Sequence, residues 1–339
     1  MAENSKIEWC DHTFNPWEGC TKVSPGCAHC YAEARNRRFA GGVNWGPGAP
    51  RRHTSPANWK QPLAWEREAA DLYILRAHQT GAGEPIRFQR PRVFCASLAD
   101  WLDDEVPAAW LAELLDLIRS TPHLDWLLLT KRPQLWRPRM EQVVALEIAD
   151  GPSGADQCYG VALAAAWLNG LAPANVWVGT TVEDQTRADE RIPALLEIPA
   201  VIRFLSCEPL LGALDIEEYL DDQCDGGYIL GSAPIHWVIC GGESGPKSRP
   251  MHPAWARELR DQCASTSVPF LFKQWGEWLP CERVGDKITC TTPVLAKQPK
   301  EPELYEFYAG NQFMARVGKA AAGRLLDGIE HTAFPEAKR

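Results

Sequence analysis

The sequence lacks any apolar stretch long enough to cross a membrane. Its longest uninterrupted apolar run, Val161–Leu168, is far shorter than the roughly 20 residues that a transmembrane helix needs. The first residues, Met1–Glu8, are polar and mixed in charge and do not resemble a secretory signal. These absences predict a soluble protein without a membrane partner, and we expect it in the cytoplasm.

The motifs of several common enzyme classes are also missing. The chain contains no G-x-S-x-G element, no phosphate-binding Walker loop and no H-E-x-x-H pair. Ordinary serine hydrolases, nucleoside triphosphatases and zinc proteases are therefore not indicated. A hydrolase without redox chemistry would have to use carboxylate pairs drawn from Glu183, Glu208 and Glu243, which is a weaker alternative.

Positive charge is scarce overall but concentrated in one segment. The 339 residues include 35 Lys and Arg against 44 Asp and Glu, a net charge of −9 that argues against a general nucleic-acid coat protein. Residues 31–60, however, contain Trp45, Trp59 and a single acid, Glu33, beside six basic residues. Arginines interleaved with tryptophans suit a phosphate backbone and stacked bases, so a nucleic acid or nucleotide is a predicted partner. The alternative is an ordinary solvated surface whose tryptophans anchor loops. The basic residues are Arg35, Arg37, Arg38, Arg51, Arg52 and Lys60.

Short apolar segments alternate with amphipathic helical patterns along most of the chain. The segments are nearly continuously apolar, as in strands buried on both faces of a parallel sheet. Repeated strand–helix units imply right-handed crossovers, so we predict a partial (β/α) TIM-like barrel of about six to seven parallel strands, with a doubly wound open sheet as the alternative. The expected strands are His12–Asn15, Arg92–Ala96, Asp125–Thr130, Asn175–Thr180, Ala200–Ser206, His236–Cys240 and Val268–Lys273, and the expected helices are Tyr31–Phe39, Pro107–Arg119, Pro133–Ile148, Asp184–Leu196 and Pro253–Ala264.

Insertions and a C-terminal appendage complete the expected organisation. Residues 1–279 would form the barrel, and residues 280–339 a connector and a helical appendage. We expect loops at Gly41–Pro62 and Gly151–Gly160, a connector at Pro280–Pro302 and an appendage helix at Gln312–Leu326.

Three of the twelve cysteines lie close together. They form the motif Cys20-x6-Cys27-x2-Cys30 in the loop after the first expected strand. Three closely spaced thiolates suit an iron–sulfur cluster, and a 4Fe–4S cluster held by three cysteines leaves one iron open to a small molecule. The alternatives are three free thiols and a zinc site whose fourth ligand is Cys10, His12 or His29.

Polar side chains follow every expected strand, at the end where α/β barrels carry their chemistry. Some of them cap helices, but capping does not explain lysines and carboxylates that come from several strands together. Their convergence predicts a polar ligand site, in which Lys131, Glu208 and Lys273 are the candidate catalytic residues.

A three-cysteine loop after the first strand of an incomplete barrel resembles the radical S-adenosylmethionine superfamily. That superfamily usually has C-x3-C-x2-C, so the longer gap between Cys20 and Cys27 departs from its main pattern. A phage-associated, prophage-borne family of unknown function with this three-cysteine motif is a closer match over nearly the whole chain. The resembling segments are Trp9, Thr13–Trp17, Gly19–Thr21, Cys27–Glu33, Ser206–Leu210, Gly241–Gly245, Phe272–Gly276, Gly318–Gly328 and Phe334–Pro335.

The resemblance implies a cofactor and an activity. The open iron would take the amino and carboxylate groups of S-adenosylmethionine, and with an external electron donor the protein would generate a 5′-deoxyadenosyl radical to modify or repair a nucleic acid or nucleotide. A non-enzymatic zinc- or cluster-stabilised module that binds a nucleic acid or a partner is the alternative. Glu243 follows two glycines, as in the Gly-Gly-Glu motif of the superfamily, but it comes after a different strand. The role of that motif, which is to bind the amino group of S-adenosylmethionine, is therefore not assigned to Glu243. The implied cofactor-binding residues are Ser97 and Asp100 after the second expected strand, Glu183 as acceptor for the ribose hydroxyls, and Gly241, Gly242 and Glu243 after the sixth, where glycines let the backbone approach an adenine.

Overall fold

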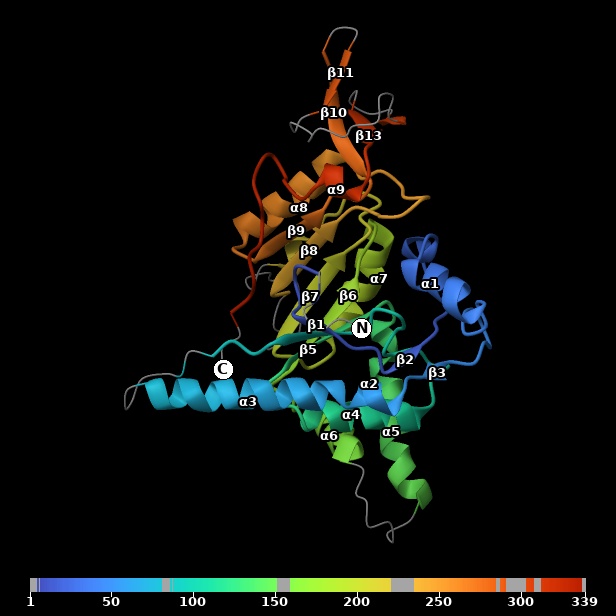
Figure 1. Ribbon diagram of the computed structural model, residues 1–339, viewed down its shortest axis with the longest axis vertical. Helices are drawn as coiled ribbons and strands as arrows, with labels where there is room; N and C mark the ends of the chain where they lie inside the picture. Colours follow the sequence, from blue (N-terminus) through green and yellow to red (C-terminus); the bar gives the residue numbers. More distant parts are fainter. Residues whose placement is uncertain are drawn as a thin grey trace.

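The computed structural model describes residues 5, 7–80, 86, 88–150, 159–220, 235–284, 287–290, 303–307 and 312–336. Its main body is a curled sheet of seven parallel strands that forms a half-barrel flanked by helices (Figure 1). The strands lie side by side in chain order, which confirms the predicted partial barrel; a doubly wound sheet would reverse that order. The strands are β1 (His12–Thr13), β4 (Arg92–Cys95), β5 (Asp125–Thr130), β6 (Val176–Thr181), β7 (Ile202–Cys207), β8 (Trp237–Gly241) and β9 (Phe270–Gln274).

Helices cover the outer face of this sheet. Helices α4, α5 and α6 pack on one another, α7 contacts β6, and α8 contacts β8 and β9. This arrangement follows from the connections, because each crossover between parallel strands returns over one face of the sheet. The helices are α1 (Tyr31–Ala40), α2 (Pro56–Trp59), α3 (Gln61–Gln79), α4 (Ala108–Arg119), α5 (Trp136–Asp150), α6 (Tyr159–Leu168), α7 (Gln185–Leu196), α8 (Pro253–Ser265) and α9 (Lys319–Ala322).

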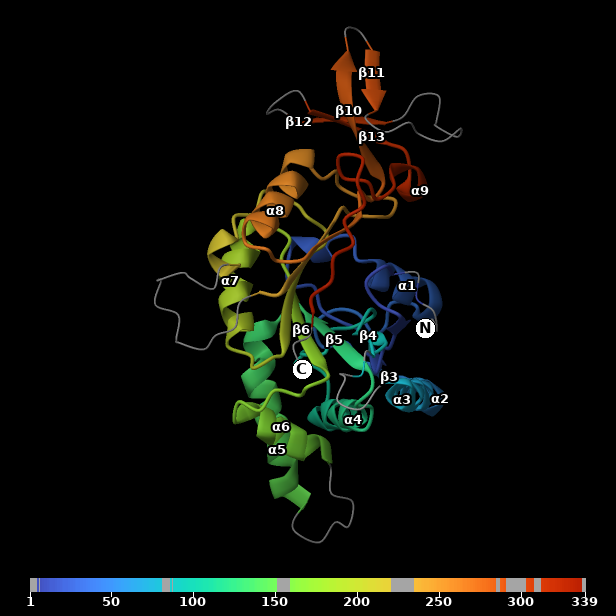
Figure 2. The same ribbon diagram turned by 90° about the vertical axis from the view of Figure 1, so that its left-hand side faces the viewer.

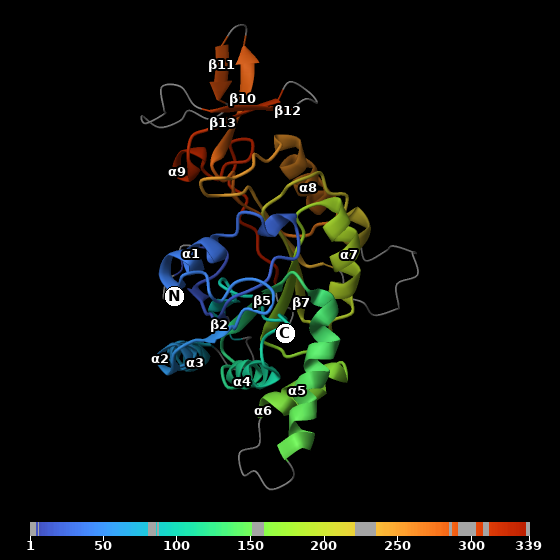
Figure 3. The same cartoon turned by 90° about the vertical axis from the view of Figure 1, so that its right-hand side faces the viewer.

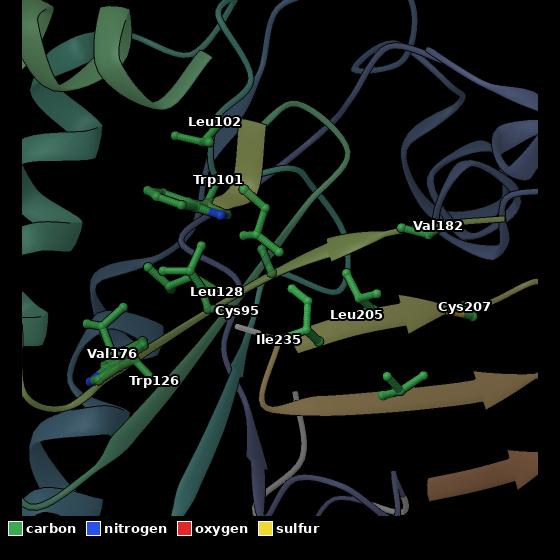
Figure 4. Packing of buried hydrophobic residues seen from close by; sticks show 14 of the residues in the cluster. Cys95, Trp101, Leu102, Trp126, Leu128, Val176, Val182, Leu205, Cys207 and Ile235 are labelled. Carbon is green, nitrogen blue, oxygen red and sulfur yellow. The ribbon is translucent and has the colours of Figure 1, made fainter. Parts of the chain in front are cut away.

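Successive residues of each strand point to opposite faces of the sheet, and both faces are apolar. On the outer face, Leu128, Val176 and Leu205 belong to the layer beneath the helices, part of which is shown in Figure 4. On the inner face, a separate cluster of rings fills the half-barrel. The centroid of Trp237 lies 6.1 Å from that of Trp177 and 6.5 Å from that of Trp9. This ring cluster forms the floor beneath the carboxyl ends of the strands.

The C-terminal tail covers the outer edge of β9. The His331 carbonyl accepts a hydrogen bond from the Phe272 amide at 2.9 Å. Trp237 Nε1 donates to the Ala333 carbonyl at 2.9 Å, and the Phe334 ring lies 5.0 Å from that of Trp237. The tail therefore pairs with the last strand and packs onto the inner ring cluster.

The sequence pattern does not predict α3, a helix of 19 residues. It begins at the end of the expected loop Gly41–Pro62, a segment that also contains α2. Trp65 and Ala69 are buried, whereas Leu72 and Leu75 are exposed. Because its apolar residues do not gather on one side, the helix lacks the periodic pattern by which amphipathic helices are recognised.

The expected appendage helix at Gln312–Leu326 is wrong. Its first part is a strand, β13, in a four-stranded antiparallel sheet that projects from one end of the molecule (Figure 2). Phe313 and Met314 are buried against this sheet, and Gly318 and Gly323, with φ angles of +86° and +70°, interrupt the helical pattern, leaving only α9. The strands of this sheet are β10 (Trp278–Val284), β11 (Lys287–Cys290), β12 (Leu304–Phe307) and β13 (Gln312–Arg316).

Parts of the expected insertions lie outside the described residues. Residues 151–158 of the loop Gly151–Gly160 do so, as do residues 285–286 and 291–302 of the expected connector. The described residues of that connector, 280–284 and 287–290, belong to the paired strands β10 and β11, so the expectation of a connector is wrong there. The division at residues 279 and 280 stays a prediction. No helix in the described part of the chain combines the length and apolar character of a membrane span.

Candidate functional site

A cavity of about 810 Å³ opens at the carboxyl ends of the strands, beside the inner ring cluster. Its wall includes all three clustered cysteines together with polar side chains from several strand ends. The structure therefore brings these residues around one space, and their chemical roles stay predictions. The predicted site residues that line the cavity are Cys20, Cys27, Cys30, Ser97, Asp100, Lys131, Glu208 and Lys273.

The cysteine loop, residues 17–33, leaves the sheet after β1 and ends in helix α1. Its first residues form β2 (Trp17–Glu18), which pairs with β3 (Arg52–His53). Pro25–Cys27 forms a 3₁₀ turn, and Cys30 is the N-cap residue of α1. The loop is thus tied to regular structure on both sides of the cysteines.

Two strand ends hold the cysteine loop by side-chain hydrogen bonds. After β5, Arg132 donates Nη1 to the Cys20 sulfur at 3.6 Å and Nη2 to the Thr21 carbonyl at 2.9 Å. After β6, Glu183 accepts a hydrogen bond from the Gly26 amide at 3.1 Å. Each cysteine-bearing half of the loop is therefore anchored to the sheet.

Glu243, after β8, makes a third attachment through His29 and Arg249. Its Oε2 lies 3.1 Å from His29 Nδ1 and accepts a hydrogen bond from Arg249 Nε at 2.8 Å. Arg249 Nη2 in turn donates to the Pro25 carbonyl at 3.1 Å. Burial alone would raise the pKa of the Glu243 carboxyl, but the Arg249 and His29 hydrogen bonds hold it below its ordinary value. Glu243 is therefore an ionised anchor of the loop.

Neither Glu183 nor Glu243 lines the cavity. Glu183 is fully buried, and its Oε2 accepts a hydrogen bond from Arg191 Nη1 at 2.8 Å. The cofactor roles of both residues stay predictions. In the structure, however, each carboxylate already binds an arginine and the cysteine loop.

The residues considered as a fourth zinc ligand also lie away from the cavity wall. Cys10 is buried in the inner ring cluster. His12 stacks on Trp65 with ring centroids 4.2 Å apart, and His29 is bonded to Glu243. The cavity therefore receives three of the candidate ligands rather than four.

The three cysteines supply the sulfur ligands that a soft metal prefers, and all three line the same cavity. Burial, followed by the Asp100 carboxylate, raises the pKa of the Cys20 thiol to about 12, and burial also raises the pKa of Cys30. Such thiols keep their protons unless a cation compensates, and a coordinated metal does so. No three metal-ligating side chains of the described residues are already clustered, so binding a cluster would require the sulfurs to draw together.

Lys131, Glu208 and Lys273 supply charged groups to the same cavity. Lys273 Nζ donates to Glu208 Oε2 at 2.5 Å, and Lys131 Nζ donates to Thr181 Oγ1 at 3.1 Å. The second oxygen of Glu208, Oε1, is buried without a hydrogen-bond partner among the described residues. A buried acceptor left unpaired costs stability, so Oε1 is suited to accept a hydrogen bond from a ligand.

Ser97 and Asp100 line the cavity but are engaged by the protein. Asp100 accepts hydrogen bonds from Arg132 Nη1 at 3.0 Å and from the Lys131 amide at 2.9 Å. Ser97 Oγ accepts from Asn15 Nδ2 at 3.0 Å. Asp100 thus orients the arginine that holds Cys20.

Arg132 and Arg249, the two arginines that hold the cysteine loop, are not among the predicted site residues. A signal for Arg132 was present, because it follows a strand beside the candidate Lys131. No comparable signal marks Arg249, which reaches the loop through a chain reversal after Glu243.

The basic segment of residues 31–60 is not a single exposed surface. Arg51 is buried, and its Nε donates to Asp103 Oδ2 at 2.8 Å. Trp59 stacks on His53 with ring centroids 4.9 Å apart. Arg51 and Trp59 therefore belong to the scaffold, which corrects their assignment to a nucleic-acid surface.

The two glycines after β8 have different neighbours. A Cβ at Gly242 would stand 2.1 Å from the Trp275 carbonyl oxygen, whereas a Cβ at Gly241 would meet only the Glu208 side chain, at 3.3 Å. The close approach at Gly242 is thus to the protein's own backbone. The predicted contact of both glycines with an adenine remains a prediction.

Gly242→Ala should lower the free energy of unfolding by about 2–3 kcal/mol, because overpacking against a backbone carbonyl forces the strands apart. Gly241→Ala should cost less than about 1 kcal/mol, since a side chain can give way. Denaturant unfolding of both variants measures the difference. Equal stability of the two would show that the approach to Trp275 does not require glycine.

The fold and the cavity define an α/β half-barrel protein with a three-cysteine loop at the carboxyl ends of its strands. The chain matches the family described as "Protein of unknown function (DUF5131)" over residues 4–335, and it belongs to that family. No curated protein and no solved structure gives a significant match to the chain.

Proposed function

We propose that Cys20, Cys27 and Cys30 hold a 4Fe–4S cluster with one open iron, and that the cavity binds S-adenosylmethionine beside it. The protein would be a radical enzyme that modifies or repairs a nucleic acid or nucleotide. A phage or prophage origin, suggested by the same motif, is part of this proposal. The observation that carries it is the meeting of three cysteines at one cavity, whose wall does not include Cys10, His12 or His29.

The chain's own residues would orient the cofactor and shield the site. When bound and reduced by an external donor, such a cluster supplies the electron that splits S-adenosylmethionine into methionine and a 5′-deoxyadenosyl radical. Arg132 and Glu183 would set the position of the cysteine loop from two strand ends. Glu208 Oε1 would accept a hydrogen bond from the cofactor or substrate, with Lys131 and Lys273 facing its anionic groups.

The test is reconstitution of the protein with iron and sulfide under anaerobic conditions, followed by two measurements. S-adenosylmethionine should raise the melting temperature, because a ligand that binds only the folded state stabilises it. With a strong reductant, 5′-deoxyadenosine should then form. A reconstituted protein that shows neither response would favour the non-enzymatic, metal-stabilised binding module.

A further inference from the structure

One flank of the molecule carries exposed cations and exposed apolar side chains together. Helix α1 and the turn after it stand out at this flank (Figure 3). Tyr31, Phe39 and Val43 are 61%, 69% and 63% exposed. We call the whole surface the α1 patch, which consists of Tyr31, Arg35, Arg37, Arg38, Phe39 and Val43.

The α1 patch is cationic although the whole chain is acidic. No Asp or Glu occurs between Glu33 and Glu66 in the sequence. Glu18 and Glu33 do pair with patch arginines, but their side chains are only 11% and 12% exposed, against 45% for Arg35 and 71% for Arg37. The acids therefore lie beneath the patch and the guanidinium groups lie above them.

Arg38 adds a charge that no carboxylate of the described residues neutralises through an ion pair. Its guanidinium lies 5.2 Å from the centroid of Phe39, and that of Arg35 lies 5.5 Å from the same ring. Phe39 is an exposed ring with two guanidinium groups nearby, so the patch offers an apolar surface for a nucleobase and charges for the adjoining phosphates. This combination fits a polynucleotide better than an acidic protein segment, because every nucleotide carries both a flat base and a phosphate.

The α1 patch is continuous with the cavity. Tyr31, at the start of α1, lines the cavity next to Cys30, and its hydroxyl donates to the Ser97 carbonyl at 2.7 Å. A strand lying along α1 would thus lead one of its nucleotides toward the cysteines. The cavity has room for a single nucleotide rather than a duplex. An unpaired strand can therefore enter it without the free-energy cost of separating a base pair.

We infer that the α1 patch binds single-stranded nucleic acid and delivers it to the cavity. This inference names the substrate class of the proposed radical enzyme and in that respect rests on the proposed function. The binding itself depends on phosphates and one stacked base, so it does not require the cluster.

The experiment is fluorescence anisotropy of a labelled 20-nucleotide oligo(dT), oligo(U) and a duplex of the same length, over a range of salt concentrations. The full-length protein is measured with and without reconstituted cluster. Single strands should bind, more tightly than the duplex, with an affinity that falls as salt rises because counterions are released. The two single strands show whether DNA or RNA is preferred.

Arg37→Ala/Arg38→Ala should weaken binding about tenfold or more and flatten the slope of log affinity against log salt by about 1.4, for two lost phosphate contacts. Phe39→Ala should weaken binding at least about fivefold through lost stacking. The matched control is Arg67→Ala/Arg76→Ala, which removes two exposed arginines from α3 and should change neither the affinity nor the slope.

Several results would overturn the inference. The first is an unchanged affinity in Arg37→Ala/Arg38→Ala, and the second is an equal loss of affinity in the α3 control. The others are a duplex that binds as tightly as the single strands, and binding of anionic phospholipid vesicles in place of oligonucleotides. If 5′-deoxyadenosine forms but no oligonucleotide binds, only this inference fails. If oligonucleotides bind through the α1 patch but no 5′-deoxyadenosine forms, the proposed radical chemistry fails instead.

Discussion

Replacing Cys20, Cys27 or Cys30 singly with alanine should leave the half-barrel folded and remove its bound iron. The three side chains are half-buried at the cavity wall rather than packed in the core, so their loss creates no large internal void. Each supplies one of only three thiolates to the proposed cluster, and two ligands would not hold it. Iron content and visible absorption after anaerobic reconstitution measure the effect.

Cys263→Ala is the control for these variants. Cys263 is fully buried on α8, on the outer side of the sheet, and burial raises its pKa to about 12, so it behaves as a small core residue. This variant should lose some stability but keep its iron. Cys10→Ala should also keep iron, and if it lost iron as completely as Cys27→Ala, the site would have four protein ligands and no open iron.

Replacing Glu183 with alanine should destabilise the fold by about 3–5 kcal/mol, because it leaves Arg191 buried without its partner. Glu183 and Arg191 have side chains that are 0% and 6% exposed, and their ion pair is 2.8 Å long. The Gly26 amide would also lose its acceptor, so uptake of iron should be slower. Thermal and denaturant unfolding of the cluster-free protein measure the loss in free energy of unfolding.

The matched control is Glu190→Ala on α7, the helix that carries Arg191. Glu190 is 58% exposed and lies 3.6 Å from Arg187, so its loss should cost no more than about 0–1 kcal/mol. A Glu183→Ala protein as stable as this control would return Glu183 to the predicted role of a ribose contact.

The stability difference at Glu183 should depend on pH. Burial alone would raise the pKa of this carboxyl, but Arg191 and Lys131 hold it below its ordinary value. A lowered pKa means that the ionised form stabilises the folded state, and this contribution is lost as the pH falls through the folded-state pKa. The difference in free energy of unfolding between the parent protein and Glu183→Ala should therefore be largest at neutral pH and decrease in acid.

The strands of the half-barrel could be predicted because they are buried on both faces. Asp125–Thr130 is the same segment in the sequence prediction and in β5, and the predicted strand Asn175–Thr180 is shifted by one residue at each end relative to β6. A strand that is buried on both faces reads as a continuous apolar run, so it can be recognised without knowing to which face of the sheet each residue points. In β13 the buried run is only three residues long, and the partner strands that make it a strand are not visible in the local sequence pattern.

The position of the candidate site could also be predicted, but not the direction of each side chain. Lys131 and Glu183 both follow expected strands, yet only Lys131 faces the cavity. Successive residues alternate between the two faces, so an uncertainty of one residue at a strand end exchanges inside for outside. The partner of Glu183, Arg191, lies on the helix that follows, and a contact between a strand end and a helix leaves no periodic trace in the sequence.

The most direct test of the account is metal analysis of the parent protein purified without oxygen. If Cys20, Cys27 and Cys30 hold a 4Fe–4S cluster, the reconstituted protein should contain about four iron and four sulfide per chain and little zinc. One zinc per chain without iron or sulfide would contradict the central claim, and the cysteine loop would then be a structural metal site.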